Sequence, residues 1–422
     1  MTGDQLLAAA AEFDTPLYVY DLDVVRERLD LLISLFAGRF GVSYAIKSNP
    51  NLALLTALRP GLSTFDASSG AEVMRAQAAG MDPGRITFSG PAKRRFEIEL
   101  AIDAGIGEMV IESIDEARTA SAMAVAKGRV QPVLVRINPL KVPRGFGASM
   151  AGTPSQFGID EEEIDTALPE ISALPGLALK GFHIYSGTNC RDASVIAENF
   201  SIFAGIFCAA QKASGIRPER LVFGSGFGIP YLPGETLLDH TLLPDLLNPI
   251  VDELKSQSAF AMAECNLELG RWLVGPAGWL LTRVISKKSS RGAEIRTCDA
   301  GFNNHLAACG MMGSVIRRNW IFENASNPGG ELGKYTLTGP LCTSIDRLAF
   351  DIKLPEVRVG DVLSIPMSGA YGLTASPSRF ISHPEPREVV FDNGALRDAT
   401  ESRLNWAEDK KALWRREHDR GD

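Results

Sequence analysis

The stretch VSYAIKSNPN, residues 42–51, joins an alternating apolar run to a lysine and a polar turn. Apolar residues alternate from Val42 to Ile46, which is the pattern of a strand, and a segment able to begin a helix follows Lys47 at once. The same order of strand, polar turn and helical stretch recurs along the chain up to residue 275. Strands that alternate with helices predict parallel βαβ units, so this stretch is expected to be the first strand of a repeating α/β fold.

Eight such β-type runs lie between residues 42 and 270, and helical stretches separate them. Eight strands that alternate with helices predict a (β/α)8 TIM barrel, whose usual size of about 250 residues fits the segment 31–275. The runs after the first are STFDAS (from residue 63), ITFSG (86), MVIES (109), PVLVRIN (132), LKGFHIYSG (179), RLVFGSGFG (220) and FAMAECNLELG (260). The predicted helices include 70–81, 93–105, 115–128, 191–214 and 235–256.

After Pro276 the pattern changes to strands that are joined by turns, which predicts a separate antiparallel β domain over residues 276–400. Its runs are GWLLTRVISKKSS, AEIRTCDAGF, RLAFDIKLPEVRVGDVLSI and REVVFDNGAL. The N-terminal segment 1–30 contains PLYVYDL, which is expected to add a strand to that domain, and residues 401–422 form a charged tail. The predicted fold class is therefore α/β, a TIM barrel followed by an antiparallel β domain. The loop 139–158 is long enough to be expected to be functional or mobile.

The composition argues against several classes of protein. A net charge of −8 without basic clusters argues against nucleic-acid binding, and no apolar run is read as a membrane span. The five histidines are scattered, so no metal site is expected. The cysteines form no CxxC pair, which predicts free thiols in a reducing, cytoplasmic compartment; they are Cys190, Cys208, Cys265, Cys298, Cys309 and Cys342.

A barrel of this kind carries its active site at the C-terminal ends of its strands. The first strand ends at Lys47, and the seventh ends in the glycine turn FGSGFGIPY, which contains Gly224, Ser225 and Gly226. A lysine, a histidine, an arginine, a carboxylate and a glycine turn are thus expected to converge on one face. The other strand ends present Asp66, Arg136, His183, Ser186, Glu268 and Arg271.

These residue types together suit a phosphorylated aldehyde. Backbone N–H groups at the glycine turn can surround a phosphate, and Arg271 can add a forked cation. Lys47 can form a Schiff base with pyridoxal phosphate, Glu268 can keep its ring nitrogen protonated, and His183 can lie flat on the ring. Alternatively, the glycines serve only to form a tight turn, and His183 is a core residue whose hydrogen bonds are satisfied.

From about residue 15 to residue 390, the chain resembles the barrel-type (fold type III) pyridoxal-phosphate decarboxylases, which include ornithine, arginine and diaminopimelate decarboxylases. YAIKSN is similar to their Schiff-base lysine motif, FHIYSG to their histidine-serine motif, FGSGFGIPY to their phosphate turn and ELGR to their Glu-Pro-Gly-Arg. GPLCTSID, with Cys342, and GAYG, with Tyr371, are similar to two motifs of their β domain. Six motifs in the family's order make the resemblance specific.

The resemblance implies a role for each motif residue. Lys47 would bind the cofactor aldehyde, Glu268 would pair with the pyridinium, and His183 would stack on the ring. Cys342 would come from the second subunit of a head-to-tail homodimer and protonate the quinonoid carbanion that loss of CO₂ leaves. Asp66 and Arg136 would support the lysine region. The phosphate would be surrounded by Ser186, Gly224, Ser225, Gly226, Arg271 and Tyr371.

Three departures from the family pattern bear on the substrate. Leu269 replaces the proline of Glu-Pro-Gly-Arg, which is expected to have a local effect. Thr343 follows Cys342 at the position where ornithine-type enzymes carry aspartate and diaminopimelate-type enzymes carry glutamate, so it cannot pair with a distal ammonium. The Arg-Pro segment that follows Asp-Ala-Gly in diaminopimelate enzymes is missing from CDAGFNNHLAACGMMGSVIRRN.

NNHLAACG followed by VIRRN, which contains Arg317 and Arg318, is similar to a subgroup from antibiotic and exopolysaccharide gene clusters. One branch of that subgroup decarboxylates a glutamyl group carried on an acyl-carrier protein. The predicted function is therefore α-decarboxylation of an amino acid or a carrier-tethered aminoacyl group in a biosynthetic pathway, with Arg317, Arg318 and Thr343 near the substrate. The two arginines are alternatively a solvated pair on a turn.

Other functions remain open on the sequence. A diaminopimelate or ornithine/lysine-type decarboxylase of primary metabolism shares the same motifs. An amino-acid racemase shares the barrel, the lysine and the phosphate site, although it uses a tyrosine as its second base. A non-enzymatic pyridoxal-phosphate carrier would be a lone barrel, and a catalytically dead homologue would be expected to have lost cofactor residues.

Overall fold

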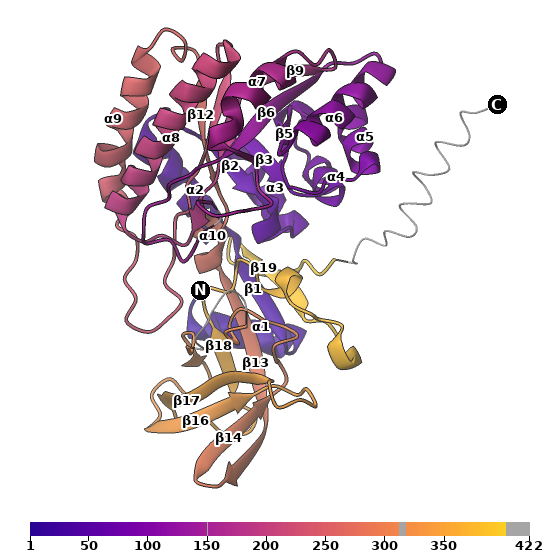
Figure 1. Ribbon diagram of the computed structural model, residues 1–422. Coiled ribbons are helices and arrows are strands. Elements are labelled where there is room, and N and C mark those ends of the chain that lie inside the picture. The colour runs from indigo at the N-terminus through magenta and orange to yellow at the C-terminus, as the bar shows by residue number, and fades with distance from the viewer. Residues whose placement is uncertain (150, 312–317, 402–422) are drawn as a thin grey trace, which may run out of the picture.

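The structure is a computed structural model that describes residues 1–149, 151–311 and 318–401. A barrel ringed by helices lies above a second part built mostly of strands (Figure 1). The barrel strands are parallel and close on themselves in the order β5-β4-β3-β2-β12-β11-β9-β6, because β6 also pairs with β5. Their bounds are β2 Gly41–Ala45, β3 Thr64–Ala67, β4 Ile86–Phe88, β5 Glu108–Ile111, β6 Gln131–Asn138, β9 Leu177–Ile184, β11 Arg220–Gly224 and β12 Glu264–Leu269. All eight predicted barrel strands are confirmed.

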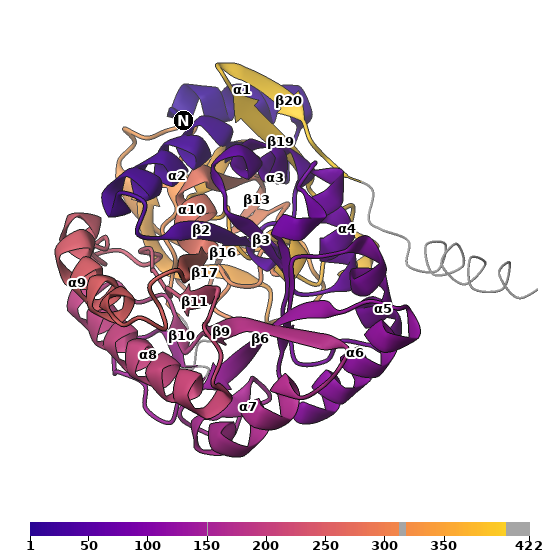
Figure 2. The same ribbon diagram turned by 90° about the horizontal axis from the view of Figure 1, so that it is seen from above.

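Helices cover the outside of the barrel, as the view from above shows (Figure 2). The helix predicted before β12 begins too early, because a short 3₁₀ turn (His240–Leu242) precedes α9. Helix α2 packs between α3 and α9, so the barrel's helical layer begins at Leu22, inside the predicted N-terminal segment 1–30. The helices are α1 Gly3–Phe13, α2 Leu22–Phe36, α3 Leu52–Leu58, α4 Gly70–Ala78, α5 Arg95–Ala104, α6 Ile114–Ala126, α7 Ile164–Ser172, α8 Ala193–Ser214, α9 Leu243–Ser256 and α10 Arg271–Val274.

Helix α8 shows how the barrel core forms. Asp192 caps its first turn, and Gly215, with a φ of 70°, ends it. By length and composition alone the helix could cross a membrane, but it packs between α7 and α9 and turns buried phenylalanines toward the barrel. Phe200 stacks on Phe223 of β11, and Phe207 stacks on Phe182 of β9. The apolar length of α8 is therefore accounted for by this core.

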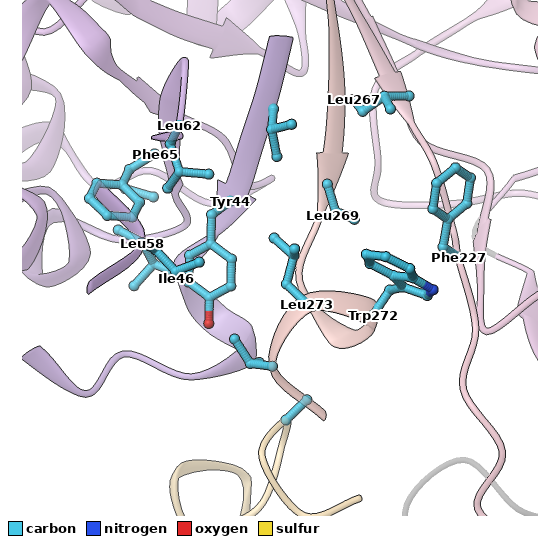
Figure 3. Close-up of a cluster of buried hydrophobic side chains, with 14 of the residues drawn as sticks. Tyr44, Ile46, Leu58, Leu62, Phe65, Phe227, Leu267, Leu269, Trp272 and Leu273 are labelled. Carbon is cyan, nitrogen blue, oxygen red and sulfur yellow. The ribbon is translucent and has the colours of Figure 1, made fainter. Parts of the chain in front are cut away.

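Another part of the same apolar cluster lies at the C-terminal ends of β2 and β12 (Figure 3). Tyr44 and Ile46 face it from the side of β2, and Leu269 and Leu273 face it from the side of β12 and α10. Leu269, which stands where the family has proline, is buried in this cluster. The cluster fixes the two chain segments that carry Lys47 and Arg271.

The second part of the fold is a sheet in the order β17-β16-β14-β13-β1-β19-β20, to which β18 and β15 are added beside β13. Strand β1, from the segment PLYVYDL, lies between β13 and β19 in this sheet. The sheet was expected to be antiparallel, but it is mixed, because β1 pairs with β19 and β14 pairs with β16 in parallel. The strands are β1 Leu17–Asp21, β13 Gly278–Ser290, β14 Ala293–Cys298, β15 Glu323–Asn324, β16 Leu332–Thr338, β17 Arg347–Pro355, β18 Val362–Ile365, β19 Arg387–Asp392 and β20 Ala395–Asp398.

The parallel pairs have a physical cause. Parallel neighbours need a long connection, and both pairs have one, since the whole barrel lies between β1 and β19, and residues 299–331 lie between β14 and β16.

The long loop 139–158 is also partly ordered by strands. Its β7 (Ala148–Ser149) pairs with β10 (Gly187–Thr188), and β8 (Ile159–Asp160) extends the barrel sheet beside β6. The predicted charged tail, from residue 402 onward, lies outside the described residues.

We expect Phe223→Ala to destabilise the barrel strongly. Phe223 is fully buried, and its ring contacts those of Phe40, Phe200, Phe203 and Phe207. Loss of a buried phenylalanine typically lowers the free energy of unfolding by about 3–5 kcal/mol. The melting temperature and the urea midpoint should both fall clearly.

Val125→Ala is the control for this prediction, because Val125 is 51% exposed on α6. It should change the free energy of unfolding by no more than about 0.5 kcal/mol. A wild-type urea midpoint for Phe223→Ala would contradict the proposed role of the aromatic cluster.

Candidate active site

Two adjoining cavities lie at the C-terminal ends of the barrel strands. The larger has a volume of about 370 Å³ and is lined by Arg136, Phe157 and His183, among others. The second lies against the glycine turn after β11, where Ser225 and Gly226 line it. The two cavities are parts of one site, because they share Lys47, Tyr185, Thr188, Glu268, Arg271 and Tyr371.

The turn that carries Lys47 is fixed by its neighbours. After β2 the chain enters a short 3₁₀-helix, Ile46–Ser48. The Ser48 hydroxyl donates to the carbonyl of Ala45 at 2.8 Å, and the Tyr44 hydroxyl donates to the carbonyl of Asn49 at 3.0 Å. The Lys47 side chain is 41% exposed and lines both cavities. A turn fixed by hydrogen bonds thus presents a partly exposed amine to the site.

Two acidic side chains surround the Lys47 ammonium. Its Nζ lies 3.8 Å from Asp66 Oδ2, and the charge of Glu268 also acts on it. Burial by itself lowers the pKa of Lys47, but the negative charges of Asp66 and Glu268 outweigh burial and raise it. Lys47 is therefore a cation when no cofactor is bound.

The pKa values of the two carboxyl groups are shifted in opposite directions. Burial alone would raise the pKa of Glu268, but the charge and the 2.7 Å hydrogen bond of His183 Nε2, together with Lys47 and Arg136, lower it. Burial and the charge of Glu268 raise the pKa of Asp66, although Lys47 opposes this. The site therefore holds one ionised carboxylate and one carboxyl that takes up a proton readily. Such a separation of neighbouring carboxyls is typical of sites that handle protons.

The turn after β11 requires glycine at two positions. A Cβ on Gly224 would lie 2.3 Å from the Tyr185 ring. Gly226 has a φ of 63°, and a Cβ there would lie 2.6 Å from the carbonyl oxygen of Gly187 and 2.7 Å from the Phe146 ring. Ser225 holds the turn in place, because its hydroxyl donates to the carbonyl of Glu268 at 3.0 Å.

Arg271 lies beside this turn, at the start of α10. Its guanidinium is 4.7 Å from the centre of the Tyr371 ring, and it donates a hydrogen bond to the Tyr231 hydroxyl. Arg271 Nε and His183 Nδ1 are buried and have no hydrogen-bond partner among the described residues. Because buried polar atoms normally have partners, both indicate a place for a ligand.

The site fits pyridoxal phosphate at each end. Arg271 and the glycine turn supply a cation and close backbone N–H groups for a phosphate. Lys47 supplies an amine for the aldehyde, and the ionised Glu268 supplies a carboxylate for the ring nitrogen. The residues are therefore of the right type and on the right sides of one site to hold the cofactor.

Several predicted residues lie outside the lining of both cavities. Ser186 is buried, and its hydroxyl donates to Asn199 of α8 at 2.9 Å. Cys342 is exposed, and Thr343 is half-buried, on the loop between β16 and β17. Asp66 reaches the site through its ion pair with Lys47. Arg318 is exposed, and Arg317 falls outside the described residues.

Sequence reasoning missed other residues of the site. Tyr185, inside the FHIYSG motif, lines both cavities, and Lys47 Nζ is 5.7 Å from the centre of its ring. Phe157 of the long loop packs 4.5 Å from the Arg136 guanidinium. Glu112, which forms an ion pair with Arg136 at 3.1 Å, directly follows β5. The rule that strand ends carry function would have found Tyr185 and Glu112.

We expect the cofactor-free protein to lose stability as the pH rises from about 5 to about 8. The raised pKa of Asp66 means that the folded protein binds this proton more tightly than the unfolded chain does, so unfolding releases it. Stability then falls with pH above the ordinary aspartate pKa and levels off above the folded pKa. Asp66→Asn should flatten this part of the profile, measured as melting temperature.

Asp252→Asn is the matched control, because Asp252 is an exposed aspartate paired with Arg39. The hydrogen bond from Arg39 lowers the pKa of Asp252, so its titration changes the stability only below the tested pH range. Equal slopes for the wild type and Asp66→Asn would show that Asp66 is not the group that titrates.

Comparison with known proteins agrees with this geometry. The L-glutamyl-[BtrI acyl-carrier protein] decarboxylase of Niallia circulans is 32% identical over 93% of this chain and 92% of its own length. The diaminopimelate decarboxylase of Methanothermobacter thermautotrophicus is 33% identical over 93% of this chain and 90% of its own length.

Solved structures show the same fold. Diaminopimelate decarboxylase from M. jannaschii in complex with L-lysine has a TM-score of 0.84 at 26% identity, covering 94% of this chain and 91% of that chain. The family model described as "Pyridoxal-dependent decarboxylase, pyridoxal binding domain" matches residues 22–275. The chain therefore belongs to the family of pyridoxal-dependent decarboxylases and is an enzyme that uses pyridoxal phosphate as its cofactor.

Proposed function

We propose that this enzyme removes the α-carboxylate of an amino acid or a carrier-tethered aminoacyl group, and that it prefers a glutamyl group on an acyl-carrier protein. The charge of the cavity carries the proposal. Among the described residues that line the cavities, Glu268 is the one carboxylate, and His183 already binds it. A buried ammonium without a carboxylate partner is strongly unfavourable, so the distal amino group of ornithine or lysine has no counter-charge here.

Two further features support a tethered, acidic substrate. Thr343, next to Cys342, offers a hydroxyl in place of a carboxylate. The relative from Niallia circulans is named for a glutamyl group on a carrier protein. Arg317 and Arg318 are proposed to meet the phosphate of the carrier's phosphopantetheine arm, because a guanidinium fork matches phosphate oxygens. The biosynthesis of a secondary metabolite is the proposed setting.

Diaminopimelate decarboxylation is the second candidate. The relative from Methanothermobacter thermautotrophicus carries that name at 33% identity, and so do several solved structures of the same fold. In that case the counter-charge for the distal end of the substrate would have to come from outside the described cavity lining. The two candidates differ in the substrate and share the decarboxylation step.

The chain's own residues are proposed to divide the work. Pyridoxal phosphate, when bound, supplies the electron sink for the bond between Cα and the carboxylate. Lys47 holds its aldehyde carbon, Glu268 keeps a proton on the ring nitrogen, and His183 orients Glu268 and faces the ring. Asp66 and Arg136 keep these charges in place. The phosphate is held by Gly224, Ser225, Gly226, Arg271 and Tyr371, with Ser186 supporting the neighbouring wall.

Cys342 is proposed to act in a second copy of the chain. It is exposed and lines neither cavity of its own subunit. Its loop has a fixed shape, because the buried Asp346 accepts hydrogen bonds from the backbone N–H groups of Phe302 at 2.9 Å and Leu341 at 2.8 Å. In a homodimer the thiol would enter the partner's site and donate a proton to Cα. The free state of all six cysteines supports a cytoplasmic location.

We expect a glutamyl carrier protein to be decarboxylated faster than free glutamate, and both faster than free ornithine, lysine or diaminopimelate. CO₂ release from each substrate measures this. The double variant Arg317→Ala, Arg318→Ala should raise KM for the carrier protein and leave the rate on free glutamate unchanged. Lys287→Ala, Lys288→Ala, an exposed cation pair on β13, is its control and should behave as wild type.

Fast turnover of free ornithine or lysine would contradict the substrate proposal. Preference for diaminopimelate would select the second candidate, and the decarboxylase family would stand in either case. An unchanged KM in the arginine double variant would remove the two arginines from carrier binding.

We expect the active site to be shared between subunits. Lys47→Ala and Cys342→Ala should each be inactive as homodimers, since each lacks one residue of every site. Mixed dimers of the two variants contain one intact site, so activity should return after subunit exchange, toward about a quarter of the wild-type rate for random mixing. Mass spectrometry of the intact dimers verifies that the subunits have exchanged.

Cys208→Ala, which alters another cysteine outside the site lining, provides the control for loss of a thiol and should remain active alone. No recovery after verified exchange of Lys47→Ala and Cys342→Ala would contradict shared sites.

A further inference from the structure

A buried carboxylate joins three segments of the site that are far apart in the sequence. Glu112 directly follows β5, and its side chain is 2% exposed. Its Oε1 accepts hydrogen bonds from the Gly90 N–H at 2.9 Å and from Arg136 at 3.1 Å. Its Oε2 accepts from the Gly158 N–H at 2.8 Å. One side chain thus ties the end of β4, the strand β6 and the end of the long loop together.

The three segments form one wall of the larger cavity. Gly90, Arg136 and Phe157, the neighbour of Gly158, all line it. The Arg136 guanidinium contacts both Glu112, at 3.1 Å, and the Phe157 ring, whose centre is 4.5 Å away. Contacts on both sides therefore fix the direction in which this cation faces the cavity.

The backbone is shaped to bring both N–H donors to the carboxylate. Gly90 has a φ of 112° and Gly158 has a φ of 73°, where residues with a Cβ are strained. A Cβ on Gly158 would also lie 3.0 Å from the carbonyl oxygen of Arg136. The other side of Gly90 is fixed as well, because its carbonyl accepts from the buried Lys93 ammonium at 2.8 Å.

A glutamate that served only as a counter-ion for Arg136 would not need the contacts with the backbone N–H groups of Gly90 and Gly158. Glu108, at the other end of the same strand, shows the simpler case. It is buried and pairs with Arg220 at 2.7 Å, and neither residue lines the active-site cavities. Glu112 differs because two of its three donors are backbone groups of the cavity wall and the third is a cavity-lining cation.

Arg136 in turn acts on the pair at the centre of the site. Its positive charge is one of those that keep Glu268 ionised, after His183 and Lys47. The direction of Arg136 therefore bears on the carboxylate that is proposed to meet the cofactor ring. A side chain that sets this direction acts on the cofactor without touching it.

We propose that Glu112 is a positioning residue that orients Arg136 toward the His183–Glu268 pair and fixes the cavity wall, so that cofactor affinity depends on it. The proposal goes beyond the choice of substrate and holds for any amino acid that the enzyme decarboxylates. It concerns a residue that contacts neither the proposed cofactor phosphate nor Lys47.

The test measures the dissociation constant of pyridoxal phosphate by visible absorbance, on enzyme first freed of cofactor. Glu112→Gln keeps the shape, but its amide nitrogen must face one of three hydrogen-bond donors. Displacement of Arg136 and of the cavity wall should weaken cofactor binding by about as much as loss of one hydrogen bond to a charged group, so the dissociation constant should rise by about tenfold. The absorption band of the bound cofactor should also shift, since the charge around Glu268 changes.

Glu108→Gln is the matched control, since it changes a buried, ion-paired glutamate of the same strand away from the site. It should lower the melting temperature of the cofactor-free enzyme and leave the dissociation constant as in wild type. Glu112→Gln should lower that melting temperature no more than Glu108→Gln does. Wild-type cofactor affinity in Glu112→Gln, or an equal loss in Glu108→Gln, would overturn the proposal.

A double variant tests the route through Arg136. If Glu112 acts through Arg136, adding Glu112→Gln to Arg136→Gln should raise the dissociation constant of the cofactor by much less than Glu112→Gln does alone. If the effects of the two substitutions on cofactor affinity are fully additive, Glu112 does not act through Arg136. Should Glu112→Gln fail to fold, Glu112→Asp replaces it, because the shorter carboxylate keeps the charge but cannot reach all three donors. It should weaken cofactor binding several-fold relative to Glu108→Asp, and wild-type binding would overturn the proposal.

Discussion

The site depends on one electrostatic arrangement, a lysine ammonium held beside two carboxyl groups at the mouth of the barrel. Lys47 lies 3.8 Å from Asp66, whose pKa is raised, while Glu268 is kept ionised by its 2.7 Å hydrogen bond with His183 and by the charge of Lys47. Such charges interact more strongly in a protein interior than in water. Removal of one member leaves another buried charge without its partner, which costs more than the intact pair contributes. The arrangement is therefore stable only as a set, and every element around it serves to keep the set together.

Both domains supply the frame for these charges. The turn that carries Lys47 is bound to the β domain, because the Tyr371 N–H donates to the carbonyl of Ser48 and the Asn49 side chain donates to the carbonyl of Gly369. The close approach of Gly270 to Ser48 joins the same turn to the segment that carries Arg271. Movement of the β domain would thus be transmitted directly to Lys47.

The barrel and most of the site could be predicted because each barrel strand is a short, regular run whose C-terminal end faces the active site. Lys47, His183 and Glu268 follow from that rule. The mixed sheet could not be predicted, because its parallel pairs join segments separated by long connections, and periodicity carries no information on strand partners. The hydrogen-bond partner of the Ser186 hydroxyl, Asn199, could not be predicted either, because it lies within α8. Glu112 directly follows β5 and so obeys the same rule, but two of its three donors are backbone groups, which leave no sequence pattern.

Lys47 is proposed to be the residue that holds the cofactor. Borohydride reduction of the enzyme with bound pyridoxal phosphate, followed by proteolysis and mass spectrometry of the peptides, tests it most directly. The account predicts a stable phosphopyridoxyl group on the peptide that contains Lys47, and none on that peptide in Lys47→Ala. Attachment to another lysine, such as the buried Lys93, or the absence of any reduced adduct in enzyme that is demonstrably active, would contradict it.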